Sequence, residues 1–304
     1  MSKDYLLPHQ MDLLNQVRKA REEIAIGGES RGILFIGASG RGKSHAFKLL
    51  KQDIPEGVRG VQRIVPFCDV SAPIKSDATS IARYFLHTLG KPLPMTARLK
   101  PNELEVQLYS ALDACEVDVV GIQEFHNALL SKSKELRGHL NRLIKNMWNA
   151  ERSRKRVIVI SGTEEILPVF SSSSDEELRS RFSCRLYTIS LWFDSPDGVR
   201  HFRGVATSMA ARVGLLDRID LDDNIVLARL LFACEGHLRL LDSLYTRVVL
   251  LTRGSGQAST GDLLAQAFDE VLAKQPGASN PFRWTEEKLR LEMRGAQQNG
   301  EPRT

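Results

Sequence analysis

One glycine-rich segment constrains the fold of this chain more than any other. Residues 37–44 read Gly-Ala-Ser-Gly-Arg-Gly-Lys-Ser, which fits the pattern G-x-x-x-x-G-K-[ST]. The apolar run 32–36 precedes this segment, and residues 44–50 follow it with the character of a helix. A strand that leads through such a loop into a helix surrounds a phosphate with backbone N–H groups at a helix N-terminus. The sequence therefore predicts an α/β fold built on a phosphate-binding loop.

Each residue type in the loop has a chemical role in binding ATP and Mg²⁺. The glycines let backbone N–H groups face the phosphates, Lys43 reaches the β- and γ-phosphates, and the Ser44 hydroxyl is a ligand for Mg²⁺. The alternative, a glycine-rich turn without a ligand, is disfavoured by the flanking strand and helix. We expect the nucleotide to be held by Gly37, Ser39, Gly40, Arg41, Gly42, Lys43 and Ser44, with Gln123 on the opposite side.

Further strands and helices alternate along the first two thirds of the chain. This alternation predicts a mostly parallel, five-stranded sheet that is covered on both faces. Pro66 places the second strand at a sheet edge or makes it irregular. After 32–36, strands are expected at 63–68, 117–122, 156–160 and 185–193, and helices at 8–25, 78–90, 102–115 and 134–150.

The pattern changes after Phe193. Residues 197–273 show helical periodicity alone, in about four segments. Residues after Gln275 are rich in Pro, Gly, Asn and charge, and we expect them to be loose apart from an anchor at 281–284. The run Ser171–Ser174 predicts a flexible loop. The expected organisation is an N-terminal helix (1–24), a nucleotide-binding core (25–195), a helical lid (196–275) and a C-terminal tail (276–304).

Composition excludes several classes of protein and permits others. A net charge of +5 allows an anionic partner such as DNA without requiring one. No apolar stretch of about 18 residues and no apolar N-terminal signal occur, so we expect a cytoplasmic protein without a membrane span. The four cysteines are far apart in the sequence: Cys68, Cys115, Cys184 and Cys234. This spacing favours buried thiols in a reducing cytosol over a metal site.

The end of the third predicted strand, 117–122, carries the acid–base chemistry. Glu124 is placed to polarise the attacking water as a general base, although a solvated carboxylate is the simpler alternative. Gln123 stands where an Asp would normally hold Mg²⁺ through a water. Glutamine is neutral, so we expect ATP binding to survive and hydrolysis to be slow. Asp118, at the start of the strand, is a weaker substitute, and a structural role is expected for His126.

Later in the chain, four residues are candidates for contact with the γ-phosphate. Thr163 follows the fourth strand and would reach the phosphate or its water, unless it is a turn threonine. Arg179 and Arg181 precede the fifth strand, where an arginine reaches the ATP site of a neighbouring subunit, and we prefer Arg181. Arg239 opens a helix of the lid. For all three arginines the alternative is a solvated side chain.

Two groups of basic residues would meet DNA phosphates, or else are solvated helix faces. Our candidates for DNA binding are the first group: Lys75, Lys91, Arg98 and Lys100. The second group comprises Lys132, Lys134, Arg137, Arg142 and Lys145.

Taken together, these motifs resemble the AAA+ ATPases, and within them the transposition regulators TniB and TnsC. The resemblance covers roughly residues 25–285. Its most specific stretches are Asp118–Leu130, where the family usually reads apolar-Asp-Glu-apolar-His-Asn-x-Leu, and Leu136–Glu165, a helix and a strand ending in Gly-Thr. The turn at Glu235-Gly236 and the late Asn280-Pro281-Phe282 are also similar.

The resemblance implies an ATP-dependent homo-oligomer, a ring or a helical filament, that coats double-stranded DNA. Such a protein recruits a transposase and links it to a target selector of the TniQ type. Family contacts to DNA come from the region after the second strand, which corresponds loosely to Lys75 and to residues 91–100. Gln123 departs from the family pattern, so the resemblance does not imply fast ATP turnover.

Two other functions fit the same motifs. One is a replication initiator or helicase loader, although no winged-helix domain is apparent after the lid. The other is a nucleotide-gated scaffold that binds ATP and scarcely hydrolyses it, which the neutral Gln123 would favour.

Overall fold

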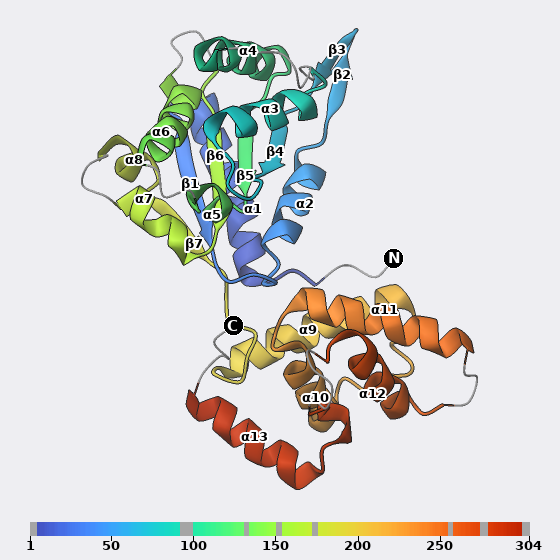
Figure 1. Cartoon of the computed structure of the whole chain (residues 1–304). Coiled ribbons are helices and arrows are strands. Elements are labelled where there is room, and N and C mark those ends of the chain that lie inside the picture. The colour runs from blue at the N-terminus through green and yellow to red at the C-terminus, as the bar shows by residue number, and fades with distance from the viewer. Residues whose placement is uncertain are drawn as a thin grey trace. The chain divides into compact units, whose positions relative to one another are not determined.

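A single parallel sheet organises the N-terminal two thirds of the protein. The structure, a computed structural model, describes residues 5–91, 100–130, 134–149, 154–171, 176–254, 258–273 and 279–299. The five strands of this sheet lie in the order β4-β5-β6-β1-β7, and all neighbours are parallel (Figure 1), so the predicted sheet is confirmed. The strands are β1 (Arg31–Ile36), β4 (Phe67–Ser71), β5 (Val119–Gln123), β6 (Val157–Gly162) and β7 (Cys184–Tyr187).

Alternate residues of each strand pack on opposite faces of the sheet, as the period of two in a strand requires. On β1, Ile33 and Phe35 join a core with α1 (Pro8–Ala25) and α2 (Lys43–Asp53). Leu34 and Ile36 join the core on the other face. That face is covered by α3 (Ala78–Thr88), α4 (Pro101–Ala114) and α6 (Lys134–Asn149), with the shorter helices α5 (His126–Leu129), α7 (Leu167–Ser171) and α8 (Glu176–Arg181).

Two strand predictions were wrong in their extent. The strand expected at 63–68 is divided at Pro66, which has no N–H for a ladder hydrogen bond. Its first part is β3 (Gln62–Ile64), which pairs antiparallel with β2 (Gly57–Arg59), and its second part begins β4. The strand expected at 185–193 ends at Tyr187, because Leu191, Trp192 and Phe193 are used in a separate, helical core.

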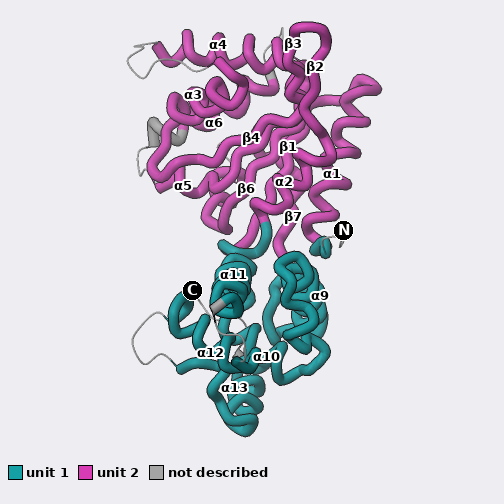
Figure 2. Tube along the Cα trace, turned by 90° about the vertical axis from the view of Figure 1, so that its right-hand side faces the viewer, with its two compact units in different colours: residues 1–8, 39–42, 189–304 teal, residues 9–38, 43–188 magenta. Residues whose placement is uncertain are grey.

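The chain divides into two compact units, which Figure 2 colours separately. The sheet unit comprises His9–Ala38 and Lys43–Thr188, and the helical unit comprises Met1–Pro8, Ser39–Gly42 and Ile189–Thr304. Between residues 196 and 273 the described part of the chain forms four helices, as expected: α9 (Pro196–Val213), α10 (Asn224–Cys234), α11 (Leu238–Gly254) and α12 (Thr260–Val271). Within the described ranges, no helix is long and apolar enough to cross a membrane.

The C-terminal region is more ordered than its composition predicted. The expectation of a loose tail was wrong, because residues after the 3₁₀ turn Pro281–Arg283 form α13 (Glu286–Asn299). Glu286 and Glu287 lie in its first turn, where negative charge is favourable, and Leu289 is buried in the helical core. The serine-rich loop predicted at Ser171–Ser174 lies outside the described residues after Ser171, which ends α7.

Candidate functional site

The phosphate-binding loop begins after β1 at Gly37, where a side chain would not fit. The Gly37 N–H donates to the Gly162 carbonyl at 3.1 Å, and a Cβ on Gly37 would lie 1.8 Å from Oγ1 of Thr188. Lys43 opens α2, and only 4% of it is exposed. Its ammonium group donates to the carbonyls of Gly37, at 2.7 Å, and Ala38, at 2.8 Å. The loop therefore holds a buried cation against its own backbone, at a helix N-terminus.

The tip of the loop, Ser39–Gly42, belongs to the helical unit. Gly40 and Gly42 have φ angles of +75° and +85°, in the left-handed region that favours glycine. The Gly40 carbonyl accepts the Leu238 N–H at 3.0 Å, and the buried Arg41 donates from Nη1 to the Gly236 carbonyl at 3.3 Å. Both glycines are thus required by the backbone that turns the loop.

Packing of α2 on β5 places the end of β5 near the loop. A Cβ on Gly121 would lie 2.8 Å from Cε1 of Phe47, so α2 crosses β5 in close contact. Lys43 lies four residues, about one helical turn, before Phe47, or about 6 Å along the axis. Gln123 lies two residues beyond Gly121, about 6.6 Å along the strand and on the same face. Gln123 and the exposed Ser44 therefore lie at the same end of the sheet unit.

A buried carboxylate, which we did not predict, contacts Gln123. Nε2 of Gln123 donates to Oδ2 of Asp69 at 2.6 Å. Oδ1 of Asp69 lies 2.7 Å from Nζ of Lys51, on α2, and the Asp69 side chain is only 6% exposed. The sequence did contain a signal, since Asp69 is a lone acidic residue inside the short apolar strand β4. Its partner is 54 residues away in the chain, and the sequence gives no direct sign of that pairing.

Glu124 and Thr163 are brought together by His126. Glu124 follows β5 with a φ of +52°, an uncommon conformation for a residue with a side chain. Its Oε2 lies 3.4 Å from Nε2 of His126, and the Thr163 N–H donates to Nδ1 of the same ring at 3.4 Å. The Thr163 hydroxyl donates to Oε2 of Glu165 at 3.3 Å. One imidazole thus bridges the ends of β5 and β6.

The three candidate arginines lie in different surroundings. Arg181, at the end of α8, is 26% exposed, lies 3.7 Å from Glu177 and stacks over the ring of Trp148 at 5.4 Å. Arg179 is more exposed, at 51%, and lies 3.7 Å from Glu176. Arg239 is exposed near the start of α11 in the helical unit. Of the two arginines on α8, Arg179 is the more exposed, whereas Arg181 has an additional contact with Trp148.

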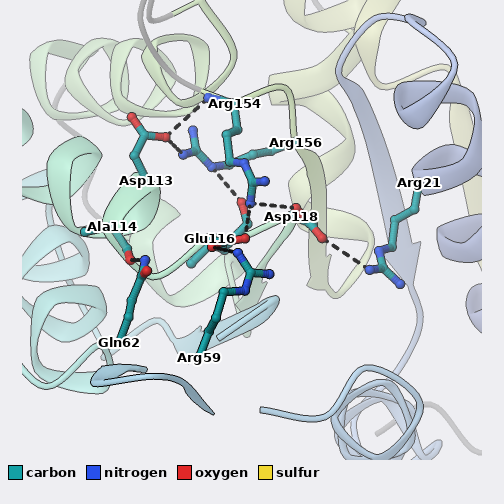
Figure 3. Close-up of polar contacts among 10 residues, drawn as sticks. Arg21, Arg59, Gln62, Asp113, Ala114, Glu116, Asp118, Arg154 and Arg156 are labelled. Carbon is teal, nitrogen blue, oxygen red and sulfur yellow. Dashed lines mark hydrogen bonds and ion pairs between the residues drawn. The ribbon is translucent and has the colours of Figure 1, made fainter. Parts of the chain in front are cut away.

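Asp118 is remote from the loop. It precedes β5, at the end of the strand opposite to Gln123. Its carboxylate is held between Arg21, at 3.2 Å, and Arg154, at 3.7 Å, in the network shown in Figure 3. The idea that Asp118 replaces the missing acid beside the metal was therefore wrong, because β5 separates it from Gln123.

The basic residues proposed for DNA binding are spread over several elements of the sheet unit. Lys75 is exposed in the turn after β4, where its φ is +57°, and its N–H donates to the Asn127 carbonyl at 3.0 Å. Lys91 and Lys100 are exposed after α3 and before α4. Arg98 and Lys132 lie outside the described residues, as do the side chains of Lys134 and Arg137. Arg142 and Lys145 lie 3.9 Å from Glu105 and 3.5 Å from Glu177.

Comparison with solved structures identifies the fold. The Aeropyrum pernix ORC2 protein, solved as ADPNP–ADP complexes, has a TM-score of 0.63 at 14% identity, covering 100% of this chain and 84% of that one. Cdc6p from Pyrobaculum aerophilum has a TM-score of 0.61 at 14% identity, with 88% and 68% covered. RuvB of Thermotoga maritima, a Holliday junction branch migration motor, has a TM-score of 0.52 at 15% identity, with 86% and 69% covered. These are P-loop AAA+ folds.

Sequence comparison identifies the family. No curated protein sequence matches the chain. The model of the family described as Bacterial TniB protein matches residues 8–190, more than half of the chain. This stretch contains the phosphate-binding loop, Gln123, Glu124, Thr163 and both arginines of α8. The chain therefore belongs to the TniB family and has the fold of the P-loop AAA+ ATPases.

Proposed function

We propose that this protein binds ATP–Mg²⁺ and, in that state, oligomerises on double-stranded DNA to regulate transposition. The observation that carries the proposal is the buried Lys43 ammonium, held against the carbonyls of Gly37 and Ala38 in a chain of the TniB family. An ammonium ion and a ring of loop N–H groups at a helix N-terminus suit the phosphates of a nucleotide.

The residues around the loop fit a bound Mg²⁺ ion. Mg²⁺ prefers a few oxygen ligands together with waters. The exposed hydroxyl of Ser44 would be such a ligand, and the amide oxygen of Gln123 would accept a hydrogen bond from a metal-bound water. When bound, the ion neutralises charge on the phosphates. Glu124 would orient and deprotonate the attacking water, and Thr163 would contact that water or the γ-phosphate. A neutral residue at position 123 supports slow hydrolysis.

The proposed partners follow from the family and from surface charge. Lys75, Lys91 and Lys100 are exposed cations, and with Arg98 they would contact the phosphates of duplex DNA. A structural relative, the Aeropyrum pernix ORC1 protein, was solved in complex with DNA, with a TM-score of 0.61 at 15% identity. The DNA-bound oligomer, a ring or a filament, would connect a TniQ-type target selector to a transposase in the cytoplasm, and Arg181, Arg179 or Arg239 would act at ATP sites.

Electron microscopy with duplex DNA and a non-hydrolysable ATP analogue tests this function. We expect nucleotide-dependent oligomers on DNA from the native protein and none from Lys43→Ala. Lys48→Ala is the matched control, since Lys48 is an exposed lysine on the same helix. If the native protein binds the analogue but never assembles on DNA, the transposition function is wrong.

A nucleotide-gated scaffold is the second candidate, and Gln123 is the observation that favours it. In this case ATP binding would drive assembly, and disassembly would not depend on the chain's own hydrolysis. Single-turnover measurement on DNA decides: release from DNA at a rate independent of ATP cleavage supports the scaffold. The only support for an initiator or helicase-loader function is the similarity of the fold. A stable complex with a replicative helicase in a pulldown would favour it.

A further inference from the structure

The pairing of Asp69 with Gln123 fixes the direction of the Gln123 side chain. An ionised carboxylate accepts hydrogen bonds and has none to donate, so the group facing Oδ2 of Asp69 must be the amide NH₂ of Gln123. The amide oxygen, Oε1, then lies on the other side of the amide group. A glutamine without such a partner would present its nitrogen or its oxygen with similar ease.

The Asp69 carboxylate has two partners, Gln123 and Lys51, and lies in a space that Gly121 leaves open. Lys51 binds the oxygen that Gln123 does not use, at 2.7 Å. Asp69 lies beside Gly121 in the register of β4 and β5, and a Cβ on Gly121 would lie 2.7 Å from Cβ of Asp69. The absence of a side chain at position 121 therefore makes room for the acid. Because its side chain is only 6% exposed, water does not compete strongly for the Gln123 contact.

The fixed orientation of Gln123 determines which of its atoms faces the nucleotide. Gln123 lies at the level of the first turn of α2, where Ser44 is exposed. We propose that Asp69 is a positioning residue: it holds Oε1 of Gln123 as an acceptor for a water on nucleotide-bound Mg²⁺. The charge of Asp69 also polarises the amide and makes Oε1 a stronger acceptor. This inference depends on the proposed ATP–Mg²⁺ site, and it explains how a neutral residue serves where an aspartate is usual.

Titration of a fluorescent ATP analogue, with Mg²⁺ and with EDTA, tests the role of Asp69. In native protein we expect Mg²⁺ to raise the affinity. Asp69→Asn should reduce this Mg²⁺-dependent gain by about tenfold, as loss of an outer-shell partner commonly does, and leave the affinity in EDTA unchanged. The double variant Asp69→Asn/Gln123→Asp keeps one acid and one amide in exchanged positions, so it should restore the gain.

Further variants separate positioning from folding. Gln123→Asp alone places a second carboxylate against Asp69. The two negative charges repel each other, so this variant should show a smaller Mg²⁺-dependent gain in affinity than the double variant. Gln123→Leu removes the acceptor but leaves Asp69 with Lys51, so it should lose the Mg²⁺-dependent gain even if Asp69→Asn does not fold. Equal Mg²⁺ dependence in native protein, Asp69→Asn and Gln123→Leu overturns the inference. Failure of the native protein to bind the analogue in either condition overturns the proposed function instead.

Discussion

Glu124 and Thr163 are joined through the two nitrogens of one imidazole ring. Nδ1 of His126 accepts the Thr163 N–H at 3.4 Å. Nε2 of the same ring lies 3.4 Å from Oε2 of Glu124. The residue proposed to activate water and the residue proposed to contact the γ-phosphate therefore both lie against one histidine, and Glu124 has the uncommon φ of +52° there.

Replacing His126 should slow hydrolysis and leave nucleotide binding intact. His126→Ala removes the group that orients Glu124, so we expect ATP turnover to fall by about tenfold or more. This is less than the roughly 10²–10⁴-fold that general-base catalysis contributes, because Glu124 itself remains. ATP affinity should stay within about twofold. His87→Ala is the control, because His87 is exposed on α3. Unchanged turnover in His126→Ala would show that Glu124 is oriented by other groups.

A mixing experiment should reveal an arginine that acts between subunits. Arg181→Ala removes the proposed arginine, and Glu124→Gln removes the proposed base, so each variant alone should be nearly inactive. Mixed on DNA, they should recover activity, since a Glu124→Gln subunit would supply Arg181 to the intact base of its neighbour.

The same experiment discriminates between the arginines of α8. Arg181 also stacks on Trp148, so its variant should melt at a slightly lower temperature, whereas Arg179→Ala should not. Arg142→Ala serves as the control for loss of one half-exposed arginine. Recovery with Arg179→Ala in place of Arg181→Ala would assign the role to Arg179.

Adding one methyl group at Gly121 should destabilise the sheet unit. The Cβ of Gly121→Ala would lie 2.7 Å from Asp69 and 2.8 Å from Phe47, and overpacking of this kind costs about 1–3 kcal/mol. Gly138→Ala is the matched control. Apart from its own helix, no atom of the described residues lies within 4 Å of a Cβ at Gly138, and alanine favours the helix by about 1 kcal/mol. Urea denaturation should therefore give changes of opposite sign. Equal effects would contradict the close approach of α2 to β5.

Local motifs made the loop and the sheet predictable, whereas distant pairings were not. Lys43 and Ser44 belong to one continuous pattern between a strand and a helix, so their neighbourhood was evident from spacing. Asp69 meets Gln123 only because β4 pairs with β5, and that register is a property of the whole sheet. α13 was missed because its charged sequence resembles a solvated tail, and its buried Leu289 is the main sign of packing.

The network around Asp118 contains the best place to test a buried charge. The guanidinium of Arg156 is fully buried, donates from Nε to the Val117 carbonyl at 3.0 Å, and pairs with Asp113. Burial lowers the pKa of Arg156, and Asp113 opposes that shift. Asp113→Asn leaves the cation without its counter-charge, and we expect a loss of about 2–3 kcal/mol in the free energy of unfolding, below the usual cost because Asp113 is 32% exposed.

An exposed ion pair provides the control for this experiment. Arg212 and Asp242 form a pair on the surface of the helical unit, and each side chain is 52% exposed. Asp242→Asn should change stability by less than about 0.5 kcal/mol, because water already solvates both charges. Denaturant curves of the two variants at neutral pH should differ clearly in midpoint. Similar midpoints would mean that Arg156 finds another partner, or water, when Asp113 is neutral, and that the network of Figure 3 rearranges at little cost.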